Sequence, residues 1–283
     1  MDQQTRQAYL ARIGIRQAVE ISPEGLAQLH LQHLRTVPFE NLSLFLDQPV
    51  QLNEAALVDK LVRQRRGGFC YEVNHAFARL LASLGFDVSL LAAQVFDGTV
   101  YGPPFDHLLL RVRFDGGDYL ADVGFGDSFL LPLPLLPGAC SHQPGASYRL
   151  ASTQGQLSLL QCKQVDDWRP LYRFSPDVHD ITDFEPMNRF HQHSPASHFT
   201  RRPICSLARP DGRISLSGAR LIITLGADRL EQPIGDAVTL RQCLKKHFGI
   251  DLSGEQAALL FARGCAAGDA VTSATGSTPS RRR

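Results

Sequence analysis

The sequence predicts an α+β protein with a helical N-terminal part, a strand-rich middle and a mixed C-terminal part. Residues 70–84 carry apolar side chains at the 3.6-residue period of a helix, and Gly85 is a stop signal. From residue 88 onward, short β-prone runs are separated by turn residues. After residue 204, three more such runs precede two helical segments. A length of 283 residues suggests about two domains at roughly 150 residues each, or three small subdomains around one site.

Four helices are expected before residue 86. The first covers residues 2–13, where helix breakers are few. Ser22, which a proline follows, indicates the N-terminus of the second helix, and Asn53 indicates the N-cap of the third. The fourth begins near Cys70 and contains the apolar period described above. All four helices therefore lie in the first third of the chain.

The strands of the middle part have a spacing that is typical of a small barrel or sandwich. Asp115 and the two glycines after it indicate a hairpin between the second and third runs. The runs in this part are residues 88–96, 107–114, 119–125, 148–151, 157–161 and 171–174.

The C-terminal part combines strands with helices. Its strand runs are residues 204–208, 213–216 and 220–225. A helix over residues 239–248 is expected to end at Gly249, and Ser253 with Gln256 resembles a capping box for a last helix. From about residue 266 the chain consists of small and polar residues with three terminal arginines, a composition that is typical of disorder.

Composition excludes several classes of function. The formal net charge is +1, which argues against nucleic-acid or membrane-surface binding driven by charge. The six cysteines are scattered, without a Cys-x-x-Cys pair, so neither a zinc ribbon nor a disulfide framework is expected. The N-terminus is polar, and no apolar run is suited to a signal peptide or a membrane span. We therefore expect a cytoplasmic protein with reduced thiols.

Cys70 follows two glycines and opens a predicted helix. Unpaired main-chain N–H groups and the helix dipole favour a thiolate at such a position, and the same N–H groups can hold an oxyanion. Arg65 and Arg66 would act in the same direction if they stay close. The alternative is a buried structural cysteine, since free cysteines are commonly inert core residues.

His107 and Asp122 are the next two candidates. His107 begins an apolar strand, and Asp122 interrupts the following one, where a buried carboxylate needs a partner. Each also has an ordinary explanation, which is a partly exposed strand end for the histidine and a hydrogen-bonded turn or an ion pair for the aspartate. Asp106 competes with Asp122 as the partner of His107.

Together, Cys70, His107 and Asp122 supply what nucleophilic catalysis requires: a nucleophile, a base and an acid that orients the base. The base and the acid share one predicted hairpin. A turn at residues 115–117 nevertheless leaves positions 107 and 122 out of register. A bulge, or a turn shifted toward residue 114, would correct this.

Several motifs, in order along the chain, resemble those of the bacterial arylamine N-acetyltransferases. The segment 37–42, VPFENL, is similar to the family's early signature, and the segment 66–74, RGGFCYEVN, is similar to its nucleophile segment. Residues 106–108 and 121–126 are similar to the segments of the other two triad residues. A further match lies within residues 188–199. The resemblance covers about residues 1–262.

The resemblance implies three subdomains around a cysteine-protease-like Cys-His-Asp core. They are a helical bundle over residues 1–86, a β-barrel over residues 87–190 and an α/β lid over residues 191–283. It also implies a ping-pong reaction of xenobiotic metabolism. In this reaction Cys70 takes the acetyl group of acetyl-CoA and passes it to an arylamine, arylhydrazine or N-hydroxyarylamine. His107 would be the base and Asp122 its orienting acid, with acetyl-CoA as co-substrate and no metal.

The resemblance also implies an acceptor pocket with aromatic walls, which suits a flat arylamine. Core packing explains each of these residues equally well when it is considered alone. The pocket positions are Phe39, Phe69, Val95, Phe125 and Phe129.

Supporting roles follow from the same resemblance. Glu40 and Arg66 are expected to form an ion pair beneath the site. The loop at residues 101–104 falls where some family members contact CoA, although its two prolines depart from the vertebrate pattern. The histidines at 191 and 193 also depart from the family pattern and leave acceptor preference open. With His198 they could bind a metal, but matching carboxylates or cysteines do not accompany them in the sequence.

Two other classes of function are compatible with these residues. A cysteine hydrolase or a transglutaminase-like enzyme uses the same Cys-His-Asp set, and a non-catalytic binding module could keep the fold. Turnover that depends on an aromatic amine would distinguish an acetyltransferase from the first class. Fast alkylation of Cys70 at neutral pH would distinguish an enzyme from a binding module. The natural acceptor, the choice among acetyl, propionyl and malonyl donors, and the oligomeric state stay open.

Overall fold

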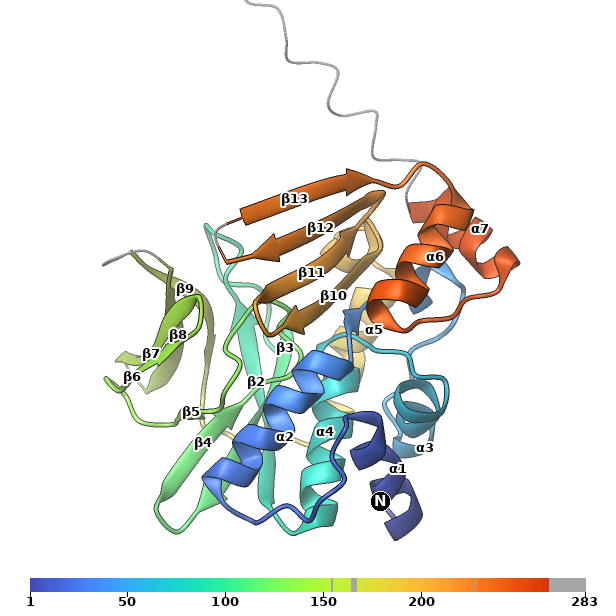
Figure 1. Ribbon diagram of the computed structural model, residues 1–283. Helices are drawn as coiled ribbons and strands as arrows, with labels where there is room; N and C mark the ends of the chain where they lie inside the picture. Colours follow the sequence, from blue (N-terminus) through green and yellow to red (C-terminus); the bar gives the residue numbers. More distant parts are fainter. Residues whose placement is uncertain (154, 164–166, 227, 265–283) are drawn as a thin grey trace, which may run out of the picture.

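The protein is described by a computed structural model over residues 1–153, 155–163, 167–226 and 228–264, and it combines helices with two antiparallel sheets (Figure 1). Helices dominate the first 86 residues, and an eight-stranded sheet and most of a five-stranded sheet follow. This mixed architecture confirms the predicted α+β class. The tail from about residue 266, which the sequence predicts to be disordered, lies outside the described residues.

The N-terminal helices begin and end where the sequence indicates. They are α1 (Gln3–Arg12), α2 (Pro23–Thr36), α3 (Glu54–Val58), which continues into a π-helical turn (Asp59–Arg63), and α4 (Cys70–Leu84). The Ser22 hydroxyl accepts a hydrogen bond from the Gly25 N–H, and the Asn53 side chain accepts one from the Ala56 N–H, as N-caps do. Gly85 ends α4 with a φ of 101°, a left-handed conformation that costs glycine little.

The larger sheet has the strand order β5-β4-β3-β2-β9-β8-β7-β6. Its strands are β2 (Asp87–Val95), β3 (His107–Phe114), β4 (Gly117–Ala121), β5 (Leu133–Pro134), β6 (Cys140–Gln143), β7 (Ala146–Thr153), β8 (Gln156–Cys162) and β9 (Trp168–Phe174). The sheet curls until its two edges approach each other. Gln143, at the end of β6, accepts hydrogen bonds from the N–H groups of Leu130 and Leu131, which precede β5. The result is a nearly closed, barrel-like sheet.

The third predicted strand is shorter than the sequence suggested. A strand was expected over residues 119–125, but β4 ends at Ala121. Residues 122–128 leave the sheet and pass the first turns of α4, where Gly124 approaches the main chain of Cys70. The apolar residues that suggested a longer strand are in part buried against this helix instead of being paired in the sheet.

The smaller sheet has the order β1-β10-β11-β12-β13 and joins distant parts of the chain. Its strands are β1 (Phe39–Glu40), β10 (Ile204–Arg209), β11 (Gly212–Ser217), β12 (Arg220–Leu225) and β13 (Asp228–Pro233). The sequence predicted the middle three. It missed β13 because all six of its residues are exposed and show no apolar alternation. It missed β1, β5 and β6 because they have only two to four residues.

Helices of the C-terminal part cover the smaller sheet at one end (Figure 1). They are α5 (Glu185–His193), α6 (Ala237–Phe248) and α7 (Gly254–Gly264), with 3-10 turns at Leu42–Phe45, Ile181–Phe184 and His198–Thr200. Ser253 and Gln256 exchange two hydrogen bonds of 2.9 and 3.1 Å, so the predicted capping box is confirmed. The helix α5 was not predicted, although a proline in its first turn is a helix-start signal.

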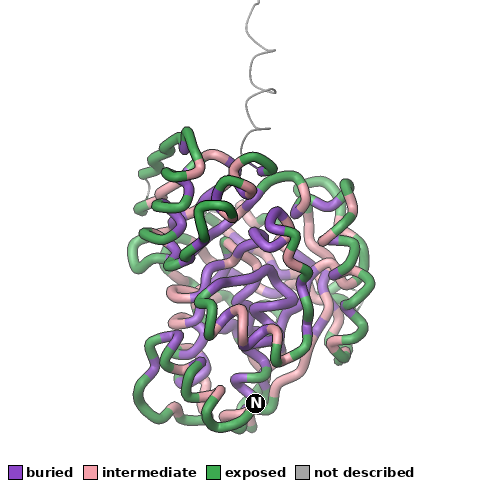
Figure 2. Tube along the Cα trace, turned by 90° about the vertical axis from the view of Figure 1, so that its right-hand side faces the viewer, coloured by how far each residue is buried: buried purple, intermediate pink, exposed green. Residues whose placement is uncertain are grey.

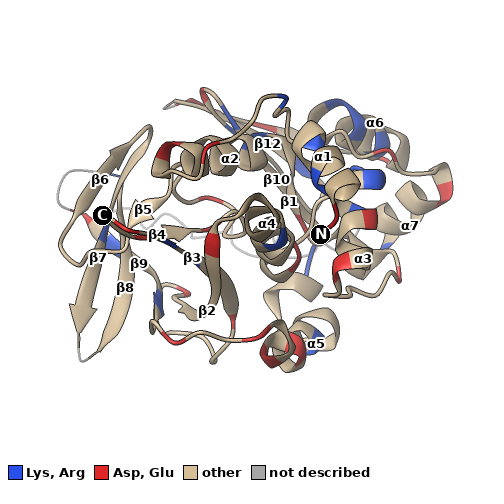
Figure 3. Cartoon of the chain, turned by 90° about the horizontal axis from the view of Figure 1, so that it is seen from below, with Lys and Arg blue, Asp and Glu red and all other residues tan. Residues whose placement is uncertain are grey.

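The most buried element is α4, which lies at the centre of the molecule with α2, α1 and β3 around it (Figure 3). Every residue from Cys70 to Ala78 is buried, and the buried part of the chain is concentrated in the middle of the molecule (Figure 2). The N-terminal end of α4 therefore opens inside the protein, beside the larger sheet. Among the described residues, no helix is both long and apolar enough to cross a membrane.

Candidate active site

Cys70 is the first residue of α4 and is only 2% exposed. The turn before it admits only glycine. A Cβ on Gly67 would overlap a main-chain carbonyl just before β1, and one on Gly68 would overlap the side chain of Glu72. The Glu72 carboxylate accepts a hydrogen bond of 3.1 Å from the Phe69 N–H and so fixes the first turn of α4. The sequence thereby places the thiol at a buried helix start.

His107 and Asp122 meet through the register of the β3–β4 hairpin. Leu110 pairs with Ala121, so position 109 faces 122, and position 107 lies two residues further along β3. Residues 107 and 109 point to the same face of the strand, and His107 therefore reaches Asp122 diagonally. The distance from His107 Nε2 to Asp122 Oδ2 is 2.7 Å. The turn comprises only residues 115–116, because Phe114 pairs with Gly117, so it is shifted toward residue 114 relative to the expected turn at 115–117. The shifted turn, and not a bulge, gives this register.

The His107 imidazole lies between the carboxylate and the thiol. Asp122 occupies Nε2, which leaves Nδ1 for the side-chain hydrogen bond with Cys70. Burial alone would lower the pKa of His107, but the Asp122 carboxylate and Cys70 outweigh burial and raise this pKa to about 10. Burial likewise opposes ionisation of Asp122, yet His107 holds the pKa of this carboxyl below its usual value. The pair is therefore imidazolium and carboxylate at neutral pH.

Asn74 holds the other oxygen of the Asp122 carboxylate. Its Nδ2 donates to Asp122 Oδ1 at 2.9 Å and to the carbonyl of Leu108 at 2.6 Å, and its Oδ1 accepts from the Val123 N–H at 2.8 Å. Asn74 thus connects α4 to β3 and to the segment that follows β4. Asn74 has no role predicted from the sequence, although it lies four residues after Cys70, on the same face of the helix. That spacing was the signal available.

Asp106 is not the partner of His107. Its Oδ1 lies 3.2 Å from Nε2 of His191 on α5, and Nδ1 of His191 bonds the Ser197 hydroxyl at 3.0 Å. The histidines at 193 and 198 are exposed. Within the described ranges, no group of three or more His, Cys, Asp or Glu side chains could hold a metal ion.

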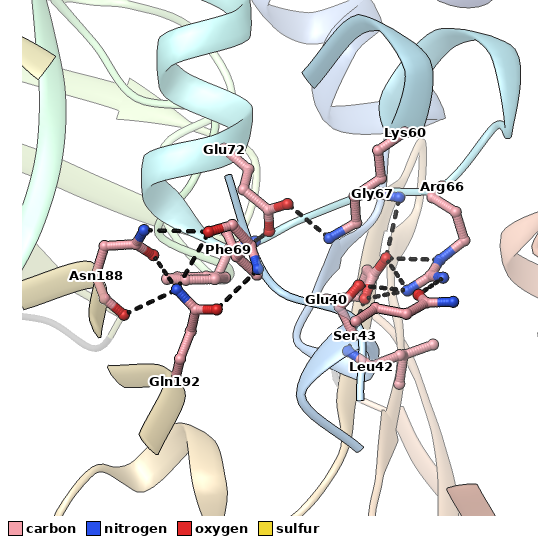
Figure 4. Close-up of polar contacts among 12 residues, drawn as sticks. Glu40, Leu42, Ser43, Lys60, Arg66, Gly67, Phe69, Glu72, Asn188 and Gln192 are labelled. Atoms are coloured by element: carbon pink, nitrogen blue, oxygen red, sulfur yellow. Dashed lines mark hydrogen bonds and ion pairs between the residues drawn. The ribbon is translucent and has the colours of Figure 1, made fainter. Parts of the chain in front are cut away.

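A second buried polar cluster lies beneath the glycine turn (Figure 4). It contains the expected ion pair between Glu40 and Arg66, with an N–O distance of 2.8 Å. The Glu40 carboxylate also accepts hydrogen bonds from the N–H groups of Leu42 and Gly67. Burial raises the pKa of Glu40, but the Arg66 cation and the other partners lower it more. The pair ties β1 to the turn that presents Cys70.

Comparison with known proteins identifies the family. A family model described as N-acetyltransferase matches residues 23–257. The arylamine N-acetyltransferase of Mycobacterium bovis is 36% identical over 263 residues, which are 89% of this chain and 92% of that protein. The chain belongs to the arylamine N-acetyltransferase family. The arylamine N-acetyltransferase / N-hydroxyarylamine O-acetyltransferase of Salmonella typhimurium is 34% identical over 87% of this chain and 89% of its own length.

Solved structures of this family share the fold. The Salmonella typhimurium arylamine N-acetyltransferase matches with a TM-score of 0.86 and 29% identity, over 93% of this chain and 99% of that one. The Mycobacterium marinum arylamine N-acetyltransferase in complex with CoA matches with a TM-score of 0.83 and 30% identity, over 91% and 99% of the two chains. The resemblance to bacterial arylamine N-acetyltransferases, which rested on short motifs, is therefore confirmed across the fold.

Three of the predicted pocket residues lie near the Cys70–His107 pair. The Phe125 ring meets the His107 imidazole edge to face, with centroids 5.3 Å apart. Val95 pairs with Tyr172, whose ring lies 5.4 Å from that of His107. Phe39 is only partly buried and lies beside the segment that carries Phe125, with its ring near Gly126.

The other two predicted pocket residues are almost completely buried in this structure. Phe69 is 0% exposed and packs against Tyr71 and Phe199, and Phe129 is 1% exposed and packs against Tyr148 and His30. Aromatic residues line pockets and fill cores alike, so the residue type could not separate these two from the first three. In this structure Phe69 and Phe129 belong to the core behind the site.

Proposed function

We propose that the protein transfers an acetyl group from acetyl-CoA to the nitrogen of an arylamine, arylhydrazine or N-hydroxyarylamine. Cys70 is the nucleophile, His107 the base and Asp122 the acid that orients the base. The buried contacts from Cys70 through His107 to Asp122, in a member of this family, carry the proposal. A cysteine beside an imidazolium and at a helix start is suited to react as a thiolate.

The first half-reaction loads the enzyme. The Cys70 thiolate attacks the carbonyl carbon of the acetyl thioester, and the carbonyl oxygen becomes an oxyanion. Main-chain N–H groups without intrahelical partners are available at a helix start and would stabilise this charge. When the tetrahedral intermediate collapses, the bond to the CoA sulfur breaks. The leaving thiolate takes a proton from the His107 imidazolium, and acetyl-Cys70 remains with a neutral His107.

The second half-reaction consumes the acetyl group. The amine nitrogen attacks acetyl-Cys70, and neutral His107 accepts the proton that this nitrogen loses. The bond to the Cys70 sulfur breaks, and the thiolate and imidazolium are restored. Asp122 favours the cationic form of His107 in the resting enzyme and keeps Nδ1 directed at the sulfur throughout, because it holds Nε2.

The acceptor ring is proposed to lie against Phe125, Val95 and Phe39. These residues are next to the reacting pair and retain partial exposure. Phe69 and Phe129 support them from the core. A flat aromatic amine gains from such contacts both apolar burial and favourable ring geometry.

The donor is proposed to extend from Cys70 toward a cavity of about 400 Å³ between the two sheets. Lys163, Arg209 and Arg213 line this cavity and suit the phosphates of a CoA thioester. The resemblance to the family implies further contacts from the loop at residues 101–104, which does not line this cavity. Asp127 also lines the cavity and pairs with Lys163 at 2.8 Å and with Arg213 at 3.3 Å. Arg209 is therefore the cation whose replacement by alanine should raise the KM for acetyl-CoA.

The domain roles follow the same proposal. Residues 1–86 carry the nucleophile, residues 87–190 carry the base and the acid, and the described residues from 191 onward form the lid of the proposed α/β part. The ion pair between Asp127 and Arg213 supports this division, since it links the segment after the acid to the smaller sheet. We place the reaction in the cytoplasm, where acetyl-CoA and a reduced Cys70 coexist.

The test is the dependence of turnover on the acceptor. The protein is mixed with acetyl-CoA, and released CoA is counted with and without an aromatic amine. We expect one fast turnover without amine and steady turnover with it. Steady CoA release that needs no amine would show a hydrolase and overturn the transferase assignment. An amide-exchange activity that ignores acetyl-CoA would indicate a transglutaminase-like enzyme instead.

A further inference from the structure

His30 lies in α2, is 0% exposed, and touches the segment that carries the triad acid from behind. Its Nε2 is 3.1 Å from the main-chain nitrogen of Asp122. Its Nδ1 is 2.8 Å from the main-chain oxygen of Leu130. One imidazole therefore spans the two ends of the segment 122–130, although 92 positions separate His30 from Asp122.

The partners dictate the protonation state of this ring. The N–H of Asp122 can only donate and the carbonyl of Leu130 can only accept. His30 must then accept at Nε2 and donate at Nδ1, which is the neutral imidazole with its proton on Nδ1. A cationic ring would turn two donors toward each other at Asp122. Burial lowers the pKa of His30 to about 4, even though Leu130 and the Asp122 carboxylate oppose this, so the ring is neutral at pH 7.

We propose that His30 is a positioning residue of the reaction: as a neutral bridge it fixes both ends of the segment 122–130 and so places the Asp122 carboxylate against His107. The proposal rests on the role given to Asp122 above. The segment requires such a bridge because it leaves the sheet after Ala121 and its buried N–H groups have no strand partner there. Gln143, at the end of β6, performs the same task for the N–H groups of Leu130 and Leu131.

The surroundings of His30 hold its ring in this orientation. The ring stacks on Phe129 at 5.6 Å with an interplanar angle of 10°, and it meets Phe77 of α4 edge to face at 6.2 Å. The titratable groups near it are the Asp122 carboxylate and, on its own helix, His33. His33 is neutral as well, since burial lowers its pKa well below the usual value. The ring is thus held by apolar stacking and by two main-chain partners.

His33 provides a matched control. It is on the same helix, is also 0% exposed, and also packs against Phe77. Its hydrogen bond goes to the Tyr9 hydroxyl at 2.9 Å and not to the segment 122–130. A substitution at His33 therefore disturbs the same core without releasing the acid. An effect that appears in the His30 variants but not in the His33 variant is therefore due to the hydrogen bonds of His30 to Asp122 and Leu130.

Three variants and two measurements test the proposal. His30→Phe keeps a ring but removes both hydrogen bonds, His30→Gln keeps one donor and one acceptor without titrating, and His33→Phe is the control. The first measurement is the pH profile of Cys70 alkylation by iodoacetamide, and the second is the rate of acetyl transfer. For His30→Phe we expect the alkylation midpoint to move up by about one pH unit and kcat/KM to fall about 10- to 100-fold. His30→Gln should recover most of both, and His33→Phe should leave the midpoint unchanged. Equal midpoints for His30→Phe and His33→Phe would overturn the proposal.

A measurement on the unaltered protein decides the case if His30→Phe does not fold. Nitrogen chemical shifts of ¹⁵N-labelled histidine should show His30 neutral with its proton on Nδ1 at pH 7. A ring with the proton on Nε2, or a cationic ring, contradicts the bridge. These shifts and the alkylation profile need neither donor nor acceptor. They would therefore still decide the role of His30 if acetyl transfer, and with it the proposed function, failed.

Discussion

Two buried histidines lie on opposite sides of Asp122, and their pKa values differ by about six units. His107, 3% exposed, contacts the Asp122 carboxylate, and its pKa is raised to about 10. His30, 0% exposed, contacts the main-chain N–H of the same residue, and its pKa is lowered to about 4. Burial acts in the same direction on both rings. The charge of the partner decides the direction of the pKa shift. A carboxylate stabilises the buried cationic ring, whereas a neutral main-chain dipole does not offset the effect of burial.

The two sides of Asp122 therefore have different roles. On the carboxylate side, α4 and the β3–β4 hairpin supply charged and polar groups that can exchange a proton with a substrate. On the main-chain side, α2 and Phe129 supply a neutral ring and an apolar stack that hold the segment still. Asp122 belongs to both sides, so its side chain and its main chain can be perturbed separately.

The largest effect should come from Asp122→Asn, which changes the carboxylate and leaves the main-chain N–H to His30 intact. We expect kcat/KM to fall about 10³- to 10⁴-fold, because the amide no longer stabilises a cationic His107. The variant should also be less stable, because Asn74 and the amide then compete for the same partners. Steady-state kinetics and thermal melts measure both. Asp115→Asn, in the exposed turn of the same hairpin, is the control and should leave kcat unchanged. A loss of less than about tenfold in Asp122→Asn would contradict the triad.

Glu40→Gln tests whether any buried carboxylate matters in the same way as Asp122. It removes the partner of the buried Arg66 cation, and we expect a loss of about 3–5 kcal/mol in the free energy of unfolding. The alkylation midpoint of Cys70 in the folded protein should stay where it is, because Glu40 is not in contact with His107. Chemical denaturation and the iodoacetamide profile measure the two. A shifted alkylation midpoint of Cys70 with an unchanged free energy of unfolding would contradict the structural role given to the Glu40–Arg66 pair.

Asn74→Ala tests the hydrogen bonds that hold the Asp122 carboxylate from the α4 side. The substitution leaves the Leu108 carbonyl and the Val123 N–H without the partners that they have now. We expect a loss of about 1–3 kcal/mol in stability. Asp122 keeps its contact with His107 and the Gly124 N–H, so kcat/KM should fall only about 10- to 100-fold. Activity equal to that of the unaltered protein would show that Asn74 does not orient the acid.

The smallest effect is the pH dependence of stability, which has opposite signs for the two histidines. The folded pKa of His107 lies above its ordinary value of 6.5, so its stabilisation is complete below pH 6.5 and is lost as pH rises toward 10. The folded pKa of His30 lies below 6.5, so its contribution is complete above pH 6.5 and is lost as pH falls toward 4. Melting temperatures from pH 4 to 10 should therefore decline at both ends. Asp122→Asn should flatten the alkaline decline and His30→Gln the acid one. If the melting temperature of each variant declines with pH as that of the unaltered protein does, these pKa shifts are not the cause of the decline.

The sequence predicts those parts of the site that local patterns encode. The glycine turn and the helix start at Cys70 are local, and so is the strand that His107 begins. The register of the hairpin is not encoded to the residue, since a turn at residues 115–117 would set position 110 opposite 122 and direct 107 to the other face. The turn at residues 115–116 brings the two side chains to one face, where the His107 imidazole reaches Asp122 diagonally.

Other parts of the site have no local signal. His30 reaches Asp122 from a helix 92 positions earlier, and its spacing within α2 is that of any buried residue. The aromatic type of Phe69 and Phe129 is the same in a pocket wall and in a core. The residues of β13 are all exposed, so only pairing with β12 reveals them as a strand. In each case the information is in a tertiary contact and not in the chain segment.

Acetyl-Cys70 is the intermediate on which the proposed reaction depends, and intact-mass measurement after brief exposure to acetyl-CoA tests its formation most directly. We predict one added acetyl group per chain, which maps to Cys70, is absent from Cys70→Ala, and disappears when an aromatic amine is added. The account is contradicted if the unaltered protein gains no acetyl group. It is also contradicted if the group maps to another residue, or if it persists on Cys70 while the amine is acetylated.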